Sequence, residues 1–335
     1  MTDELTTQQA SALAEQVLAQ VERAVVGKRD ALSLVLAAVL AKGHVLLEDF
    51  PGLGKTLAAR SFATALGLDF ARAQFTPDLL PADLTGSYVW NQRTGEFDFR
   101  PGPLFTGLLL ADEVNRTPPK TQAALLEAMQ EGQVTVEGET HLLSRPFHVL
   151  ATANPVEYEG TYPLPEAQLD RFLVRVGFGY PSAGEELDVV RRRLERQQEE
   201  VRVEPVTDAT GLAAMQAAVE RVVVDDSVAR YCVDLATATR EHSEVLVGAS
   251  PRGSLGLVLA ARAWAVIRGR DFVVPEDVKK VAVPVLAHRI TVKPELWMTQ
   301  ASGRRVVASV LESVPTPRTL DSGAGEATTS GPGRP

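Results

Sequence analysis

The sequence predicts an α/β domain with a five-stranded, mainly parallel sheet, followed by a small all-helical domain. Three observations carry this prediction. Up to about residue 180, short apolar runs alternate with segments long enough for crossover helices, which is typical of βαβ units. From about residue 182 to 314, only helical spacing remains. The chain from residue 315 onward is rich in Gly, Pro, Ser and Thr, and we expect it to be disordered.

Length and composition are those of a globular protein of one or two domains. The chain has 335 residues, of which 45% are hydrophobic and 23% are charged. Its formal net charge of −9 argues against general electrostatic binding to nucleic acid or to an anionic membrane. The single cysteine, Cys232, excludes an intramolecular disulfide and a cysteine-based zinc site.

The sequence also shows no targeting or membrane segment. The N-terminus is polar and acidic, unlike a secretory signal. The longest apolar run, residues 31–41, is too short to cross a bilayer. We therefore expect a cytoplasmic protein without a membrane span.

The strands and helices are predicted in order along the chain. Strands one, three and four are nearly continuous apolar runs, as expected for a sheet that helices cover on both faces. The predicted strands are 44–49, 70–75, 108–113, 147–154 and, as the weakest of the five, 173–180. The second zone contains helical patterns at 185–200, 208–223, 226–242, 250–269 and 275–290. We place the domains at 1–181, 182–314 and, for the tail, 315–335.

A candidate phosphate-binding loop, EDFPGLGKT, follows the first strand at residues 48–56 and precedes a helical pattern. Glycines in such a loop let backbone N–H groups turn toward phosphate oxygens, and the helix N-terminus adds partial positive charge. Lys55 would reach the β- and γ-phosphates, and the Thr56 hydroxyl would bind Mg²⁺. The strict pattern has glycine where this chain has Asp49. The residues expected at the nucleotide are Pro51, Gly52, Leu53, Gly54, Lys55, Thr56 and Leu57.

An acid pair ends the third strand. The run LLLADE closes with Asp112 and Glu113, and this strand comes next but one after the strand that carries the loop. A doubly wound sheet can place such a strand end beside the nucleotide. Asp112 would then bind Mg²⁺ through water, and Glu113 would act as a general base on the attacking water. The alternative for two such acids is a solvated turn.

Three longer motifs resemble the MoxR-type AAA+ ATPases. They lie at residues 73–86, 111–135 and 151–172, in that family's order, and the resemblance extends over roughly residues 20–310. It implies an AAA+ P-loop domain with a helical lid. It also implies Mg²⁺-dependent ATP hydrolysis coupled to chaperone-like remodelling or maturation of partner proteins. A ring, usually of six subunits, and partners similar to von Willebrand factor A domain proteins are implied as well.

The resemblance also assigns roles to three residues beyond the loop and the acids. Asn154 matches the sensor-1 asparagine, which helps to hold the attacking water and the γ-phosphate; the alternative is an Asn-Pro turn. Arg171 matches the arginine finger, which reaches a neighbour's γ-phosphate in an oligomer; the alternative is an ion pair with Asp170. Arg252 matches the sensor-2 arginine of the lid, and its alternative is an ordinary helix-start arginine.

The segment 25–32 matches the part of the family that lies against the adenine. This chain has Lys28 where the family has glutamine, so the resemblance places the adenine contact at Val26 and Gly27, through backbone and shape.

Two insertions resemble those of related AAA+ machines. Residues 88–105 predict a hairpin inserted within a helix, with a Thr-Gly turn. Residues 133–143 predict a second hairpin, with a Glu-Gly turn. In related machines such hairpins face the pore or a partner; the alternative is an ordinary loop.

Three other functions share parts of this pattern. A chelatase-type motor subunit would use the same ATPase chemistry to drive metal insertion. A nucleic-acid motor ATPase would also use it, although the net charge of −9 argues against that function. A nucleotide-gated scaffold without turnover is disfavoured by the complete set of Lys55, Glu113, Asn154 and Arg171.

Overall fold

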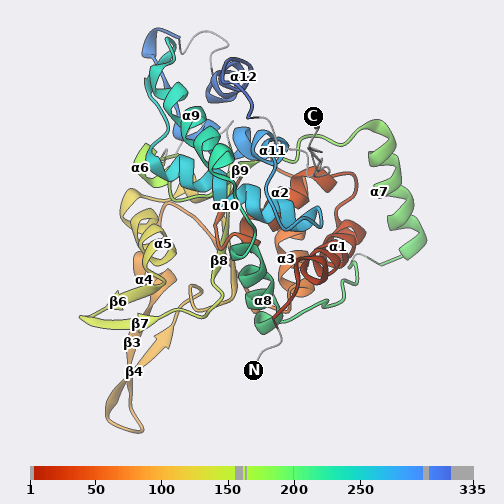
Figure 1. The fold of residues 1–335 in the computed structure, drawn as a ribbon. Coiled ribbons are helices and arrows are strands. Elements are labelled where there is room, and N and C mark those ends of the chain that lie inside the picture. Colours follow the sequence, from red (N-terminus) through yellow and green to blue (C-terminus); the bar gives the residue numbers. More distant parts are fainter. Residues whose placement is uncertain (1–3, 155–160, 163, 199, 297–301, 318–335) are drawn as a thin grey trace, which may run out of the picture.

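The central sheet has five parallel strands in the order β2-β5-β8-β1-β9 (Figure 1). The computed structural model describes residues 4–154, 161–162, 164–198, 200–296 and 302–317, and the predicted tail lies almost wholly outside them. Each of the five predicted strands is present, including the weakest. Their bounds are β1 Val45–Glu48, β2 Phe70–Gln74, β5 Leu108–Asp112, β8 His148–Ala153 and β9 Val174–Val176.

Helices cover both faces of this sheet. Successive strand residues point to opposite faces. Val45 and Leu47 of β1 belong to a core shared with three N-terminal helices, whereas Leu46 belongs to a second core on the other face. The three N-terminal helices of the first core are α1 (Thr7–Ala24), α2 (Arg29–Leu40) and α3 (Lys55–Ala65). The helices on the face of the second core are α4 (Pro81–Thr85) and α5 (Pro119–Glu131).

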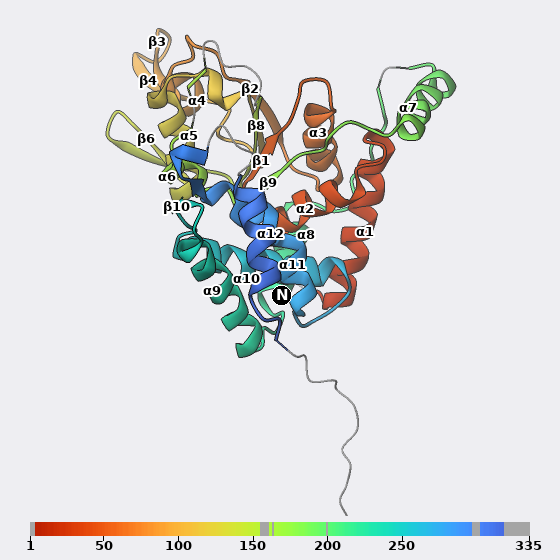
Figure 2. The same cartoon turned by 90° about the horizontal axis from the view of Figure 1, so that it is seen from above.

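The second half of the chain is helical, as predicted, and it packs against the first. Figure 2 shows the helices after residue 208 gathered on one side of the sheet. A short antiparallel pair of strands, β10 and β11, is also present, so this part is not entirely α-helical. The elements are α8 (Ala209–Glu220), α9 (Asp226–Glu241), β10 (Val245–Val247), α10 (Pro251–Ile267), α11 (Pro275–Leu286), β11 (Thr291–Val292) and α12 (Gly303–Ser313).

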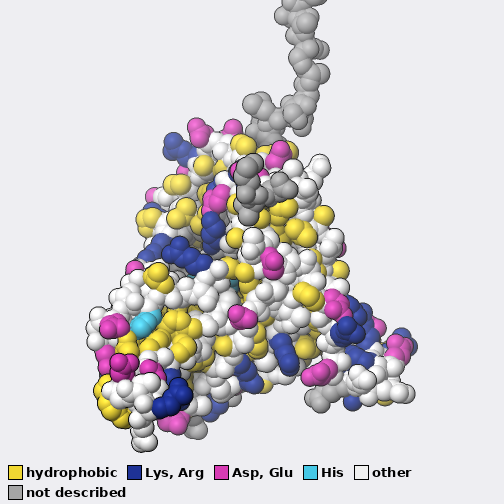
Figure 3. Space-filling model, turned by 90° about the horizontal axis from the view of Figure 1, so that it is seen from below, with side chains coloured by type: hydrophobic (Ala, Val, Ile, Leu, Met, Phe, Trp, Pro, Cys, Tyr) yellow, Lys and Arg dark blue, Asp and Glu magenta, His cyan; other side chains and the backbone are white. Residues whose placement is uncertain are grey.

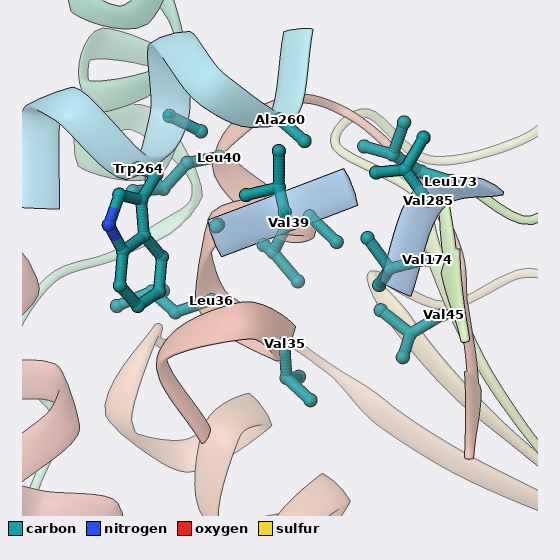
Figure 4. Close-up of a cluster of buried hydrophobic side chains, with 14 of the residues drawn as sticks. Val35, Leu36, Val39, Leu40, Val45, Leu173, Val174, Ala260, Trp264 and Val285 are labelled. Atoms are coloured by element: carbon teal, nitrogen blue, oxygen red, sulfur yellow. The ribbon is translucent and has the colours of Figure 1, made fainter. Parts of the chain in front are cut away.

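The longest apolar run of the sequence forms α2, which lies between the sheet and the helical part (Figure 4). Val39 and Leu40 of α2, Val174 of β9 and Trp264 of α10 belong to the same buried cluster. The apolar character of α2 is therefore explained by burial on several sides. Within the described residues, no helix is both long enough and apolar enough to cross a membrane.

One helix stands apart from the rest. Helix α7 (Ala183–Arg196) has no buried residue and forms the projection at the right of Figures 1 and 3. Ser182 and Glu185 form a capping box at its start. Arg192 pairs with Asp188 one turn earlier at 2.8 Å. These contacts fit the solvated, ion-paired helix that its charge pattern indicates.

The two predicted hairpins are present and pack against each other. The first consists of β3 (Gly86–Asn91) and β4 (Glu96–Pro101), and the second of β6 (Gln133–Val136) and β7 (Glu139–Leu142). The ring of Phe99 stacks on that of His141, with 3.9 Å between centroids. The expectation that the first hairpin interrupts a helix was wrong. Helix α4 ends at Thr85, and the chain after β4 enters turns rather than a helix.

Two buried histidines lie where β8 meets the helices. His44 Nδ1 accepts from the N–H of Val149, and Gln216 donates to His148 Nε2, so each ring is a neutral tautomer with one acceptor nitrogen. Burial lowers the pKa of both side chains to about 4, and at His44 the neighbouring His148 contributes to this shift. Each histidine therefore has a pKa well below the ordinary value near 6.5.

We predict that the protein loses stability as the pH falls from 7 to 5. The unfolded chain binds protons at these histidines near pH 6.5, whereas the folded chain does so only near pH 4, so stability is complete above the unfolded pKa. The loss is about 2 kcal/mol per histidine. Denaturant unfolding at pH 7, 6 and 5 measures it. His148→Gln is expected to flatten this dependence by about one histidine's share, and an unchanged slope would contradict the assignment.

Candidate active site

The loop after β1 leads directly into α3. Gly52 and Gly54 have φ of +80° and +84°, a region that side chains other than glycine rarely adopt. A Cβ at either position would meet nothing within 4 Å, so the loop is open on that side. Lys55 and Thr56 form the first turn of α3, where backbone N–H groups have no partner inside the helix. Lys55 Nζ donates to the carbonyls of Asp49 at 2.5 Å and Phe50 at 3.2 Å.

Asp49, which replaces the glycine of the strict loop pattern, is a buried anchor. Its Oδ2 accepts from the N–H groups of Phe178 and Gly179, both at 2.6 Å, and its Oδ1 accepts from the N–H of Phe50 at 3.0 Å. The ring of Phe50 also stacks on that of Tyr180, with 5.6 Å between centroids. The beginning of the phosphate loop is thus tied to the chain that follows β9.

The acid pair lies at the carboxyl end of β5, as predicted. Asp112 accepts from the Thr152 hydroxyl at 2.6 Å and from Arg72 Nη2 at 2.6 Å. Glu113 has φ of +58° and donates its N–H to Thr152 Oγ1 at 2.8 Å. Its carboxylate accepts from Gln74 Nε2 at 2.8 Å and from Arg116 at 3.2 Å. Both acids therefore have hydrogen-bonded partners on neighbouring strands or in the following turn.

Three of these partners, Arg72, Gln74 and Thr152, were missed by sequence reasoning. Arg72 and Gln74 alternate with alanines along β2, so the period-two pattern places both on one face of that strand. This alternation was the one local signal that could have indicated these two residues. It identifies them as partners of the acids only when β2 is known to lie beside β5, with Gln74 opposite Asp112 in the register.

The loop and the acids line one pocket of about 350 Å³. Of the loop residues predicted to contact nucleotide, Leu53 is not among those that line it. Burial lowers the pKa of the Lys55 ammonium, while the carboxylates of Asp49, Asp112 and Glu113 act in the opposite direction. The lining residues are Pro51, Gly52, Gly54, Lys55, Thr56, Leu57, Asp112, Glu113, Thr152 and Asn154.

The chemistry of this pocket fits a magnesium–nucleotide complex. The hydroxyl of Thr56 and the carboxylate of Asp112 both line it, and Mg²⁺ prefers a few such oxygen ligands with phosphate and water completing the coordination. The open backbone at Gly52 and Gly54 and the nearby ammonium suit phosphate oxygens. Within the described part of the chain, no cluster of three or more His, Cys, Asp or Glu residues could hold a metal ion.

Arg171 and Arg252 do not line this pocket. Arg171 borders a separate hollow beside α5, with Glu127 and Glu131. Asp170 forms its ion pair with Arg289, at 2.8 Å, and not with Arg171. Arg252 lies in the first turn of α10.

Val26 and Gly27 also lie outside the phosphate pocket. Gly27 and Lys28 border a second hollow of about 350 Å³, together with Gly177 and Phe178 after β9. Lys28 Nζ donates to the carbonyl of Tyr180 at 3.0 Å. This segment is therefore connected to the same chain that Asp49 anchors.

The sheet order, the glycine loop at the end of β1 and the acids at the end of β5 define a P-loop nucleotide-binding protein. The family model described as "ATPase family associated with various cellular activities (AAA)" matches residues 44–174, and the AAA lid domain model matches residues 237–310. The chain belongs to the MoxR-type AAA+ ATPases.

Individual relatives support this assignment over most of the chain. The Bacillus subtilis (strain 168) protein YeaC is 50% identical, covering 89% of this chain and 92% of that protein. Chaperone MoxR1 of Mycobacterium tuberculosis is 41% identical, covering 91% and 82% respectively. A crystal structure of a protein from Cytophaga hutchinsonii superposes with a TM-score of 0.86 at 40% identity, covering 93% of this chain and 97% of that one.

We predict that Asp49→Ala destabilises the fold by about 2–4 kcal/mol, since the N–H groups of Phe178 and Gly179 lose their acceptor. Asp49→Asn keeps an acceptor oxygen and is expected to cost less. Denaturant unfolding measures the loss, and amide hydrogen exchange at residues 178 and 179 locates it. Unaltered exchange at these two amides in Asp49→Ala would contradict the anchoring role.

Proposed function

We propose that this protein hydrolyses ATP with Mg²⁺ and uses the energy to remodel partner proteins. The observation that carries the proposal is the convergence of Lys55, Thr56, Asp112, Glu113 and Asn154 around one pocket. These residues come from three different strand ends, and their side chains are those that phosphoryl transfer requires.

Each residue has a separate role in this proposal. Lys55 and the loop backbone would bind the phosphates, and Thr56 and Asp112 would hold the metal, Asp112 through water. When bound, Mg²⁺ would neutralise charge on the phosphate oxygens. Glu113 accepts a proton from the attacking water, whose oxygen bonds to the γ-phosphorus as the bond to ADP breaks. Asn154 holds that water and the γ-phosphate. The resemblance of segment 25–28 supports an adenine contact at Val26 and Gly27.

We predict that two substitutions separate binding from turnover. Lys55→Ala is expected to remove measurable ATP binding, because the cation that contacts the phosphates is lost. Glu113→Gln is expected to bind ATP within a few-fold of the unaltered protein but to lower turnover by about 10²–10⁴-fold. Calorimetry and phosphate release measure the two properties. Glu241→Gln, an exposed acid at the end of α9, serves as the control.

Normal binding by Lys55→Ala would reject the phosphate role of the loop. Normal turnover by Glu113→Gln would remove Glu113 as the base while leaving the binding site intact.

We further propose that subunits assemble into a ring, in which Arg171 completes the pocket of its neighbour. Arg171 is outside its own subunit's pocket and forms no ion pair within the described residues. A cation in that position is available to a second copy. Arg252, as the matching lid arginine, would contribute to the same exchange. The resemblance to AAA+ rings supports six subunits.

We predict that two inactive variants restore activity when mixed. Arg171→Ala binds ATP but lacks a finger, whereas Lys55→Ala has a finger but an inactive pocket. In mixed rings the Lys55→Ala subunits supply fingers to Arg171→Ala pockets, and a finger is worth about 10³–10⁵ in rate. ATPase activity measured across mixing ratios should rise and then fall. A mixture no more active than its separate components would show that the sites act alone.

The proposed clients are proteins, possessing either a folded domain similar to von Willebrand factor A or an exposed apolar segment. The relative named Chaperone MoxR1 supports a chaperone function. The paired hairpins support it too, because Trp90, Phe97 and Leu142 are more than half exposed there. Figure 3 shows hydrophobic side chains gathered in the hairpin region at its lower left.

The alternatives differ in their clients. The net charge of −9 disfavours a nucleic-acid motor. Failure of DNA or RNA to stimulate hydrolysis would also argue against a nucleic-acid motor. Stimulation by a metal-inserting partner complex would favour the chelatase-type motor. We place the protein in the cytoplasm and its ATPase–lid boundary at 181/182.

A further inference from the structure

One carboxylate joins the finger segment to the lid. Asp170 follows the short helix α6 (Glu166–Leu169) and directly precedes Arg171. Its Oδ1 accepts from Arg289 Nε at 2.8 Å, and its Oδ2 accepts from the Ser250 hydroxyl at 3.0 Å. Both donors belong to the lid, whose α10 lies next to α6 (Figures 1 and 2).

The arginine in this contact is buried and almost completely paired. Its side chain is 4% exposed, against 18% for that of Asp170. Arg289 also donates to the carbonyls of Phe172 at 2.7 Å and Leu173 at 3.2 Å. Burial lowers the pKa of Arg289, the Asp170 carboxylate raises it, and the nearby charge of Arg252 lowers it. Removing Asp170 would leave a buried guanidinium without its counter-charge, which strongly disfavours this arrangement.

Close packing of α10 holds the same junction from the other side. A Cβ at Gly256 would lie 3.2 Å from Val285 Cγ1 and 3.4 Å from Leu173 Cδ1. A Cβ at Gly253 would lie 3.5 Å from Arg289 Cδ. The glycines thus let α10 approach the residues that follow Arg171, so that a shift of α10 displaces them.

Each of the two joined elements carries a cation. Arg171 is adjacent to Asp170, and Arg252 donates its backbone N–H to the Ser250 hydroxyl at 3.2 Å. Within the described residues, neither guanidinium forms an ion pair. Asp170 therefore neutralises Arg289 and leaves both Arg171 and Arg252 available.

We propose that Asp170, held by Ser250 and Arg289, is a positioning residue that fixes Arg171 and Arg252 as one unit, so that the lid of a subunit sets the finger it offers to its neighbour. This inference rests on the proposed ring and its finger. It deepens that function by naming the contact through which a lid movement reaches the adjacent pocket.

The test places Asp170→Asn in one kind of subunit at a time. Lys55→Ala subunits act as donors of fingers, and Arg171→Ala subunits act as acceptors with working pockets. In the donor, Asp170→Asn is expected to lower the restored turnover at least tenfold with an unchanged KM for ATP, because the acceptor pockets are unaltered. In the acceptor, whose finger is already absent, the same substitution should leave most of the restored activity.

This asymmetry separates positioning from general damage, which would reduce activity from either side. Asp277→Asn in the donor is the matched control, because Asp277 is also a buried carboxylate paired with an arginine, Arg270. It should permit full restoration. Co-purification of an untagged acceptor with each tagged donor confirms that the donor enters mixed rings.

If Asp170→Asn donors do not fold or assemble, Ser250→Ala donors decide the question. Ser250→Ala keeps the ion pair between Asp170 and Arg289 but removes the Ser250 hydroxyl. The restored ATPase activity should therefore fall several-fold when the donor carries this substitution and should not fall when the acceptor carries it.

The outcomes distinguish two failures. Absence of restoration with the original donor and acceptor would reject the shared pocket and this inference with it. Full restoration with Asp170→Asn or Ser250→Ala donors, or an equal loss from both sides, would overturn the positioning role while leaving the shared pocket intact.

Discussion

The candidate site depends on one topological constraint, the insertion of β8 between β1 and β5. The loop and the acids follow different strands, β1 and β5, which are not neighbours in the sheet. The Thr152 hydroxyl on β8 donates to Asp112 and accepts from the N–H of Glu113, and Thr152 itself lies opposite Leu47 of β1 in the sheet register. A left-handed conformation outside glycine costs about 1–3 kcal/mol, so Glu113 needs such support. One hydroxyl therefore holds both acids to β8, the strand that pairs with β1.

On the opposite side of β1, Asp49 performs the corresponding function toward β9. A glycine there would leave the N–H groups of Phe178 and Gly179 without this acceptor. The carboxylate stabilises the start of the loop against the sheet edge, while Gly52 and Gly54 keep the positive φ angles that glycine allows. At position 49 this chain therefore has a buried side chain that anchors the loop, where the strict motif has a glycine with a freer backbone.

The sequence allowed most of this architecture to be predicted, because the signals were local. Lys55, Thr56, Asp112 and Glu113 each follow a strand or begin a helix, so chain position alone indicated their place. Arg72, Gln74 and Thr152 could not be assigned, because their contacts depend on strand order and register. The hairpin at β3–β4 was expected within a helix, but the chain after β4 turns toward β5 instead. The β10–β11 pair was missed because strands of two or three residues carry no usable period.

Within the described residues, the lid shares one buried cluster with the sheet and its N-terminal helices, and this limits how the lid can move. Residues of α2, β9 and α10 form one buried cluster (Figure 4), so the lid cannot rotate freely about a flexible linker. Close-packed interiors change between discrete arrangements rather than deforming continuously. A displacement of α10 must therefore be accommodated where polar contacts can exchange partners. The carboxylate of Asp170 is such a place, since it binds the lid through two donors and is continuous with the chain that carries Arg171.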